Sequence, residues 1–223
     1  ILGLAGLVGS GRSETVRCLF GLDRVASGAV VLNGHPAIKA AWLSPPRALA
    51  SGMNLLSENR KEEGLAQSLG VAANMTLSAL GRYAKMGFLS LARERCIAAQ
   101  WCDDLAIKCR DVDDSVASLS GGNQQKTALA RLLHHDSDIL FLDEPTRGID
   151  VGSKAEIYVL LQKLAAQGRA IVVVSSYLPE LMGICDNIAV LHRGSMSNVK
   201  NAAAWTEHDI MVYATTGAES SAA

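Results

Sequence analysis

The sequence predicts an α/β fold in which a mostly parallel β-sheet is flanked by helices. Two continuous apolar runs of strand length, Ile139–Leu142 and Ile171–Val174, suit parallel strands that are buried on both faces. The segment between them, Lys154–Gln167, has the pattern of an amphipathic helix that ends at Gly168. Strands that alternate with helices in this way are typical of a sheet covered by helices.

The other elements follow from local patterns of apolar residues, glycines and prolines. In chain order we expect a strand at Ile1–Ala5, a helix at Ser13–Phe20, the strand Ala29–Leu32 in a hairpin with turns at Ser27-Gly28 and Asn33-Gly34, a short helix at Leu43–Ala50, a strand at Met53–Leu56, a helical block from about Val71 to Lys108, and a last strand at Ile188–Leu191.

This order of elements divides the chain into a core, an insertion and a tail. Residues 1–70 and 117–213 are expected to form the α/β core, with a truncated antiparallel β subdomain. Residues 71–116 form an inserted helical subdomain, joined at its end to the segment 119–126, and the small, polar residues 214–223 form a disordered tail. The chain opens on a buried strand with no methionine, so we expect a fragment of a longer polypeptide.

Composition narrows the class of protein. The 223 residues are 49% hydrophobic and 19% charged, which allows a real core and argues against disorder. The net charge of −1 and the aromatic content of 4% argue against a nucleic-acid-binding protein. Five cysteines without CxxC spacing fit a reducing compartment. Because no apolar run reaches the roughly 18 residues that span a bilayer, we do not expect a membrane pore.

The first motif is the glycine loop Gly6–Ser13, which matches a phosphate-binding pattern of Gly, four residues, Gly, a basic residue and Ser or Thr. Backbone N–H groups converge on a phosphate only where glycines allow unusual torsions, and the following helix points its positive end there. The Ser13 hydroxyl would complete a Mg²⁺ shell. Arg12 stands where lysine is usual, and Glu14 competes with phosphate for the helix dipole. A plain glycine turn is the alternative.

The second motif is a pair of carboxylates at the tip of a buried strand. The apolar run Ile139–Leu142 delivers Asp143 to a position where it can order the water shell of Mg²⁺. Glu144 follows and can polarise an attacking water, and Pro145 stops the strand. The alternative is an ordinary solvated acidic turn.

The third motif is the sequence Leu-Ser-Gly-Gly at Leu119–Gly122, which opens a helix with Ser120 as its N-cap. In combination, the three motifs resemble those of the ATP-binding-cassette (ABC) ATPases. Gly6–Ser13 looks like their Walker A motif, Leu140–Glu144 like their Walker B motif, and the Leu-Ser-Gly-Gly sequence like their signature. The resemblance covers about Ile1 to Tyr213 and implies a P-loop NTPase core of the ABC type with a helical signature lobe.

Finer features are similar to the second ATPase half of tandem sugar importers of the ribose, galactose and xylose type. These features are Asp143–Gly152, with a D-loop at Gly148, Ile149 and Asp150; Leu56–Lys61 followed by Gly64-Leu65; Asn74–Leu77; and Ser175–Glu180. Three positions depart from the usual ABC pattern: Arg12 replaces lysine, Glu58 replaces the Q-loop glutamine, and Ser176 replaces the switch histidine. These departures weaken this half's own phosphate site and leave its signature intact.

The resemblance implies a set of site residues. Glu144, Ser176 and Glu58 would be catalytic, Ser13 and Asp143 would hold Mg²⁺, and Gln124 would act with the signature on the partner half's ATP. The nucleotide-binding residues would be Gly6, Gly9, Ser10, Gly11, Arg12, Ser13 and Glu14, and the signature residues Leu119, Ser120, Gly121 and Gly122.

The implied function is that of an ATP-binding domain that couples ATP binding and hydrolysis to sugar uptake, with ATP and Mg²⁺ as cofactors. Its partners would be an upstream nucleotide-binding half in the same polypeptide, membrane permease subunits and, indirectly, a periplasmic or extracellular sugar-binding protein, with no nucleic acid. It would lie peripherally at the cytoplasmic face of the bacterial inner membrane, and the fragment alone would be inactive. A soluble ABC ATPase without a membrane partner and a regulatory nucleotide-binding domain remain as alternatives.

Overall fold

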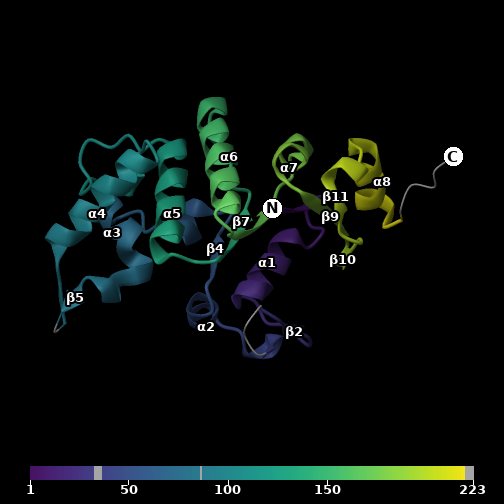
Figure 1. The fold of residues 1–223 in the computed structure, drawn as a ribbon, viewed down its shortest axis with the longest axis horizontal. Coiled ribbons are helices and arrows are strands. Elements are labelled where there is room, and N and C mark those ends of the chain that lie inside the picture. The colour runs from purple at the N-terminus through teal and green to yellow at the C-terminus, as the bar shows by residue number, and fades with distance from the viewer. Residues whose placement is uncertain (33–36, 86, 219–223) are drawn as a thin grey trace. The chain divides into compact units, whose positions relative to one another are not determined.

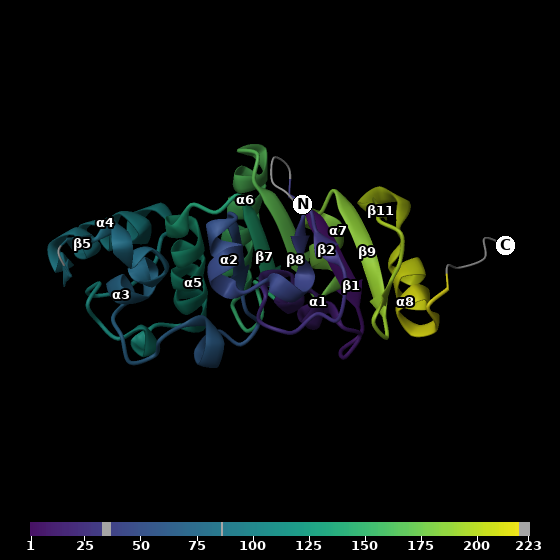
Figure 2. The same ribbon diagram turned by 90° about the horizontal axis from the view of Figure 1, so that it is seen from below.

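A seven-stranded sheet forms the centre of the larger of two compact units in this chain (Figures 1 and 2). The computed structural model describes residues 1–32, 37–85 and 87–218. The sheet order is β10-β9-β1-β8-β7-β4, with β11 also paired to β9. Its strands are β1 (Leu2–Gly6), β4 (Met53–Leu56), β7 (Ile139–Asp143), β8 (Ala170–Val174), β9 (Asn187–His192), β10 (Ser195–Met196) and β11 (Lys200–Asn201).

The central strands run parallel, as the apolar runs predict. β1 pairs in parallel with β8 on one side and β9 on the other, and β7 pairs in parallel with β8. Only β10 and β11 pair antiparallel to β9 among the described pairings of this sheet. In this register Leu4 lies opposite Val174, and Asp143 also lies opposite Val174 from the other side. The ends of β1 and β7 are therefore brought to the same edge of the sheet.

Neighbouring residues of β1 contact helices on the two opposite faces of the sheet. Leu4 belongs to a buried cluster that includes Val16 and Phe20. On the other face, a Cβ added to Gly3 would lie 3.3 Å from Leu181 in the helix α7. Successive side chains of a strand point to opposite faces, so α1 and α7 cover opposite faces of β1. The helical elements that lie wholly in this unit are α1 (Arg12–Phe20), η1 (Ala40–Trp42), α2 (Pro45–Ala50), α7 (Leu178–Ile184), η5 (Ala202–Ala204) and α8 (Glu207–Thr216).

The second compact unit is mainly helical. Its core joins Val71 and Met75 to Ala98 and Ala130, residues contributed by α3, α4 and α5. It comprises Leu56–Ser137 and Thr146–Leu160, and the larger unit comprises Ile1–Leu55, Asp138–Pro145 and Leu161–Ala223. Its elements are η2 (Arg60–Gly64), α3 (Val71–Thr76), η3 (Leu77–Arg82), β5 (Ala84–Lys85), β6 (Phe88–Leu89), α4 (Leu91–Asp104), η4 (Val116–Ser118) and α5 (Gly121–His135), and α6 (Val151–Ala166) begins in it.

Several expectations need correction. The block from Val71 to Lys108 is not continuously helical, because the β5–β6 hairpin interrupts it. The tail does not begin at residue 214, because Ala214–Thr216 complete α8, which a capping box at Thr206 and Asp209 stabilises. The rest of the expected tail, residues 219–223, and the expected turn at Asn33-Gly34 lie outside the described residues.

Two further differences concern boundaries. The strand expected at Ala29–Leu32 is limited to β2 (Ala29–Val30), which pairs antiparallel with β3 (Ile38–Lys39). The compact helical unit begins at Leu56 and includes Thr146–Leu160, whereas we expected an insertion of residues 71–116. No helix in the described part of the chain has both the length and the apolar character needed to cross a membrane.

A buried histidine sits in a polar cage at the C-terminal end of α5. Trp101 Nε1 donates to Nδ1 of His134 at 3.3 Å, so Nε2 carries the proton and faces the hydroxyl of Tyr83 at 2.7 Å. Burial lowers the pKa of His134, and the positive charges of Arg82 and His135 lower it further. A proton added to Nδ1 would oppose the N–H of Trp101.

We therefore expect the unfolding free energy to fall as the pH drops below about 6.5, the ordinary histidine pKa, because the unfolded chain then binds a proton that folded His134 refuses. Urea denaturation at pH 7.5 and pH 5.5 measures this loss. His134→Gln keeps a donor and an acceptor without a titrating ring, so the loss should be smaller in this variant. An equal loss in both proteins would contradict the assignment.

Candidate functional site

The glycine loop between β1 and α1 adopts the torsions that its sequence predicts. Gly6, Gly9 and Gly11 have φ of 152°, 78° and 103°. A Cβ on Gly6 would lie 2.6 Å from the carbonyl oxygen of Leu191, so only glycine fits there. At Gly9 the same atom would have no described protein atom within 4 Å, so the loop is open at that point. Close approach of a ligand to the backbone is therefore possible at Gly9.

The charged end of Arg12 points into the protein. Its guanidinium donates to the carbonyl oxygen of Gly6 at 2.5 Å and to that of Ser175 at 2.9 Å. It also lies 3.8 Å from the carboxylate of Glu144. The side chain is 8% exposed, and burial lowers its pKa against the opposing effect of the nearby carboxylates. Arg12 thus joins the ends of β1 and β8, and its donors serve protein oxygens.

Asp143 ends β7 beneath this loop in an environment that suits a cation. It is 3% exposed, and burial raises its pKa from 3.8 to about 6, although a hydrogen bond with Ser13 and the charge of Arg12 oppose the rise. Among the described residues, Asp143 Oδ1 is one of the few buried side-chain atoms that lack a hydrogen-bond partner. A hydroxyl and an unsatisfied carboxylate oxygen are oxygen donors of the kind that Mg²⁺ binds. Ser13 and Asp143 therefore fit the expected metal site.

The backbone of Glu144 is held in an unusual conformation. Its φ is 47°, which is the left-handed region that a residue with a side chain rarely adopts. Its carboxylate accepts a hydrogen bond of 2.7 Å from the backbone N–H of Ser176, whose own side chain is exposed. The structure therefore brings Glu144 and Ser176 together with Arg12, Ser13 and Asp143.

Two expected nucleotide residues of the loop differ in their surroundings. Ser10 is 6% exposed, and its hydroxyl is another buried atom without a partner among the described residues. Glu14 is exposed on the first turn of α1. Ser10 thus has an unused hydrogen-bonding group inside the loop, whereas Glu14 faces solvent.

The signature lies in the helical unit at the start of α5. Ser120 is exposed and caps the helix, and its hydroxyl accepts from the side-chain amide of Asn123 at 3.0 Å. Gln124 is 5% exposed, and its amide donates to the carbonyl oxygens of Val116 and Leu119 at 3.3 Å and 3.2 Å. The side chain of Gln124 therefore holds the turn before α5. This differs from the phosphate contact expected from the sequence.

The two signature glycines are closely packed against side chains of the same unit. A Cβ on Gly122 would lie 2.8 Å from the hydroxyl of Ser153, and one on Gly121 would lie 2.7 Å from a guanidinium nitrogen of Arg60. Ser153 is itself bound to Asp150, which accepts its backbone N–H at 3.0 Å and its hydroxyl at 2.8 Å. These bonds lower the pKa of Asp150. The expected D-loop therefore contacts the signature through the first turn of α6.

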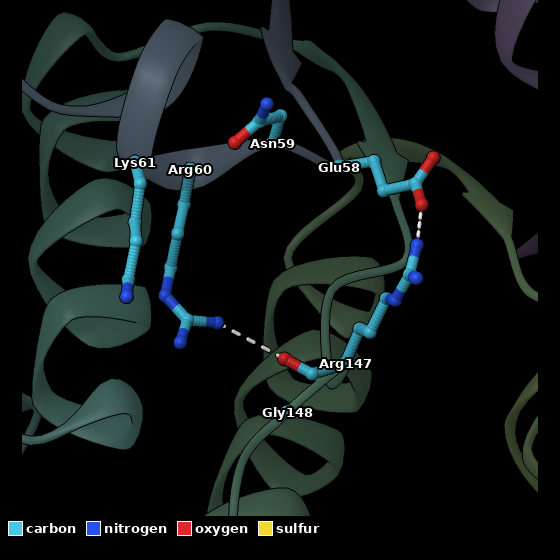
Figure 3. A pocket seen from close by; sticks show the side chains of 6 residues that line it. All are labelled: Glu58, Asn59, Arg60, Lys61, Arg147 and Gly148. Carbon is cyan, nitrogen blue, oxygen red and sulfur yellow. Dashed lines mark hydrogen bonds and ion pairs between the residues drawn. The ribbon is translucent and has the colours of Figure 1, made fainter.

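Glu58 lies in the helical unit, two residues after β4. Its carboxylate forms an ion pair with Arg147, and both line a hollow of about 500 Å³ in the helical unit, together with Asn59, Arg60, Lys61 and Gly148. Figure 3 shows this pair at one side of the hollow and Arg60 at the other, with Arg60 directed at the carbonyl oxygen of Arg147. The catalytic role expected for Glu58 stays a prediction.

Comparison with known proteins identifies the family. The sequence model of the family described as "ABC transporter" matches residues 1–147. The chain belongs to the ABC transporter family. Its fold agrees with a solved dimeric ATP-binding cassette, MJ0796, in a post-hydrolysis state bound to ADP and Pi. The TM-score is 0.76, with 23% identity over 92% of this chain and 86% of that one. The expected ABC-type fold is confirmed.

Two curated relatives of this ABC chain are import proteins. The ribose import ATP-binding protein RbsA 3 of Rubrobacter xylanophilus is 46% identical over 96% of this chain and 42% of its own length. The ribose import ATP-binding protein RbsA of Pseudomonas putida is 45% identical over 98% of this chain and 42% of its own length. The chain thus spans less than half the length of these relatives.

Sequence reasoning missed Arg60 and Arg147 as parts of the site. Both lie in segments that resemble the tandem sugar importers, Leu56–Lys61 and Asp143–Gly152, but the resemblance gave neither arginine a role. Arg60 stands two residues after Glu58, within the run Glu58–Glu63, and Arg147 follows the Walker B segment. The position of each arginine beside a recognised motif is the one feature of the sequence that could have indicated its part in the site. It did not specify which groups the arginines bind.

We expect Arg12→Ala to lower the unfolding free energy by roughly 3 kcal/mol, because it removes two buried charged hydrogen bonds and leaves Glu144 without its nearby cation. Arg17→Ala on the same helix is the matched control. Its ion pair with Asp23 is partly exposed and should contribute less than about 1 kcal/mol. Urea denaturation without nucleotide compares them, and equal small losses would refute the interior role of Arg12.

Asp143→Asn should raise the unfolding free energy in the absence of Mg²⁺, which is the opposite of the effect of Arg12→Ala. The raised pKa means that the folded state binds the proton more tightly, so stability falls as the pH rises from 3.8 to about 6 and stays lower at pH 8. Removing the charge should therefore stabilise the protein by about 3 kcal/mol at pH 8 and by less at pH 5. Thermal denaturation at both pH values checks this. Destabilisation at pH 8 would disprove the buried-charge cost.

Proposed function

We propose that this chain is an ATP-binding domain of an ABC importer that couples ATP binding and hydrolysis to the uptake of a ribose-, galactose- or xylose-type sugar. The observation that supports it most is the pairing of Ser13 with Asp143, whose buried Oδ1 lacks a partner among the described residues, beneath an open glycine loop. The identity of about 45% to ribose import proteins along nearly the whole chain supports the choice of sugar class.

ATP and Mg²⁺ are the proposed cofactors. Backbone N–H groups of the loop and the N-terminus of α1 would hold the phosphates, and Ser13 and Asp143 would hold Mg²⁺, which neutralises phosphate charge when it is bound. Glu144 would orient the attacking water or accept a proton from it. The backbone N–H of Ser176 would position the carboxylate of Glu144. Ser10, with an unpaired hydroxyl, would bind a phosphate oxygen.

This chain's own Walker A site is proposed to bind nucleotide without rapid turnover. Arg12 supports this, because its guanidinium serves carbonyl oxygens and is not free to cradle a phosphate as an extended lysine would. Ser176 supports it as well, because a hydroxyl cannot carry the positive charge of a histidine. The chain alone would then hydrolyse little ATP.

The signature is proposed to act in trans on ATP held by a partner half. The exposed hydroxyl of Ser120 and the first N–H groups of α5 form an anion-binding end of a 15-residue helix. Gln124 would act indirectly, because its amide holds the turn. The partner half would precede this chain in the same polypeptide. Membrane permease subunits would anchor both halves at the cytoplasmic face of the inner membrane, with a sugar-binding protein outside.

The experiment measures sugar-stimulated ATPase of the complete complex in lipid vesicles, with the partner half, the permease and the sugar-binding protein all present. Ser120→Gly should lower this rate at least about tenfold, because it removes a phosphate-facing hydroxyl, while a glycine N-cap costs only tenths of a kcal/mol. Ser118→Gly, at an exposed hydroxyl two residues earlier, is the matched control and should retain the rate.

Glu144→Gln in the same complex separates the two ATP sites. If this chain's own site does not turn over, the rate should fall by less than about threefold, whereas loss of a true catalytic base costs about a hundredfold or more. Complete loss of ATPase activity in the Glu144→Gln complex would contradict the proposal that this chain's own Walker A site does not turn over. An unchanged ATPase rate in Ser120→Gly would contradict the trans role of the signature. A wild-type complex whose ATPase rate does not respond to sugar would contradict sugar import.

A further inference from the structure

Arg60 forms an unusual connection between two functional motifs. It is part of the hollow defined by Glu58, Asn59, Arg60, Lys61, Arg147 and Gly148, all within the helical unit. Its Nη1 donates to the carbonyl oxygen of Arg147 at 3.0 Å, and its Nε donates to the side-chain oxygen of Gln124 at 3.4 Å. One guanidinium therefore binds both the segment that leads into the D-loop and the signature helix.

The connection continues into the signature turn. Gln124 accepts from Arg60 with its oxygen and donates with its nitrogen to the carbonyl oxygens of Val116 and Leu119. Because Gln124 is 5% exposed, these bonds are shielded from water and are worth more than surface bonds. The position of Arg60 is thereby transmitted to the residues directly before Ser120.

Gly121 lies against the guanidinium on the signature side. A Cβ on Gly121 would lie 2.7 Å from Arg60 Nη2 and 3.1 Å from the carbonyl oxygen of Gly148. A Cβ on Gly148 would lie 3.8 Å from Arg60 Nη1. The first signature glycine and the first D-loop glycine therefore approach each other around Arg60. This close packing gives a local reason for glycine at position 121.

Arg147 is held twice by the same short segment. Glu58 binds its guanidinium, and Arg60 binds its carbonyl oxygen (Figure 3). The ion pair is substantially exposed, so its own contribution to stability is small. Two attachments to one residue nevertheless restrict its rotation more than either does alone. Glu58 thus adds a second attachment to the residue whose carbonyl oxygen Arg60 binds.

We infer that Arg60 is a positioning residue that holds the signature turn, Leu119–Gly122, and the D-loop, Gly148–Asp150, in one fixed arrangement. Arginine suits this role because its planar fork offers several donors in fixed directions, whereas lysine offers a compact ammonium group. The structural part stands on the hydrogen bonds alone. Its catalytic consequence rests on the proposed function, in which both segments face ATP held by the partner half.

The structural part is tested by hydrogen–deuterium exchange on the purified nucleotide-free protein. Arg60→Met keeps the length of the side chain and removes its donors, so exchange should rise about fivefold to tenfold in peptides covering 119–125 and 146–153. Arg60→Lys should give a smaller rise. Lys61→Met, at the exposed neighbour in the same hollow, is the control and should leave both peptides unchanged.

Two controls separate this role from general destabilisation. A peptide covering α3, Val71–Thr76, should keep its wild-type exchange in Arg60→Met, because its core does not include Arg60. Faster exchange in only one of the two motif peptides, or in all peptides alike, would overturn the inference. So would an Arg60→Met protein that exchanges like Lys61→Met.

The catalytic consequence is tested by ATPase of the complete complex, with the partner half, the permease and the sugar-binding protein present. Arg60→Met should lower kcat about tenfold and change the KM for ATP by less than about twofold, with Arg60→Lys intermediate, because the loss concerns alignment in the transition state. Equal kcat in all variants would overturn the catalytic part. If the wild-type complex had no ATPase, the proposed function would fail, and the exchange data would still decide whether Arg60 links the two motifs.

Discussion

The arrangement of the larger unit around its site depends on a buried negative charge at the end of β7. Asp143 and Glu144 follow one another at the edge of the sheet, where Asp143 has little access to water and Glu144 is only 10% exposed. Burying charge without compensation is costly, so a cation or hydrogen-bond donors must lie near. Arg12 supplies the nearby cation, and Ser13 and the N–H of Ser176 supply the donors. The loop, the strand and the switch segment meet here for that reason.

The charge of Asp143 is only partly compensated by the groups around it. The pKa of Asp143 remains raised to about 6, and its Oδ1 lacks a partner among the described residues. The unusual φ of Glu144 is a second local cost in the same few residues. Such costs are tolerated where a ligand repays them, which is a property of functional sites. A divalent cation bound by Ser13 and Asp143 would remove the charge penalty.

The sequence predicted those parts of the fold that depend on local patterns. Short apolar runs such as Ile139–Leu142 favour buried strands of a covered sheet, which the structure confirms, and the φ values of Gly6 and Gly11 agree with the predicted loop. The β5–β6 hairpin was missed because its two-residue strands are too short to show a period of two. The helix α8 runs past residue 213 because its stability depends on a cap and on buried Ile210 and Ala214, which composition does not reveal.

Side-chain direction is the level at which motif reading fails. A spacing pattern places Arg12 beside a phosphate, but the choice between phosphate and protein oxygens depends on the carbonyl groups of Gly6 and Ser175, residues far apart in sequence. Gln124 and Glu58 show the same limit, because the groups that bind them, the carbonyl oxygen of Val116 and the guanidinium of Arg147, are not specified by the motif to which each belongs. In each unit, one arginine binds oxygen atoms of two separate motifs: Arg12 binds the carbonyl oxygens of Gly6 and Ser175, and Arg60 binds the carbonyl oxygen of Arg147 and the side-chain oxygen of Gln124. Arginine is suited to this because it stays charged when buried and can donate to several acceptors at once. The chemistry of a motif in this chain therefore depends on which neighbouring arginine holds it in place.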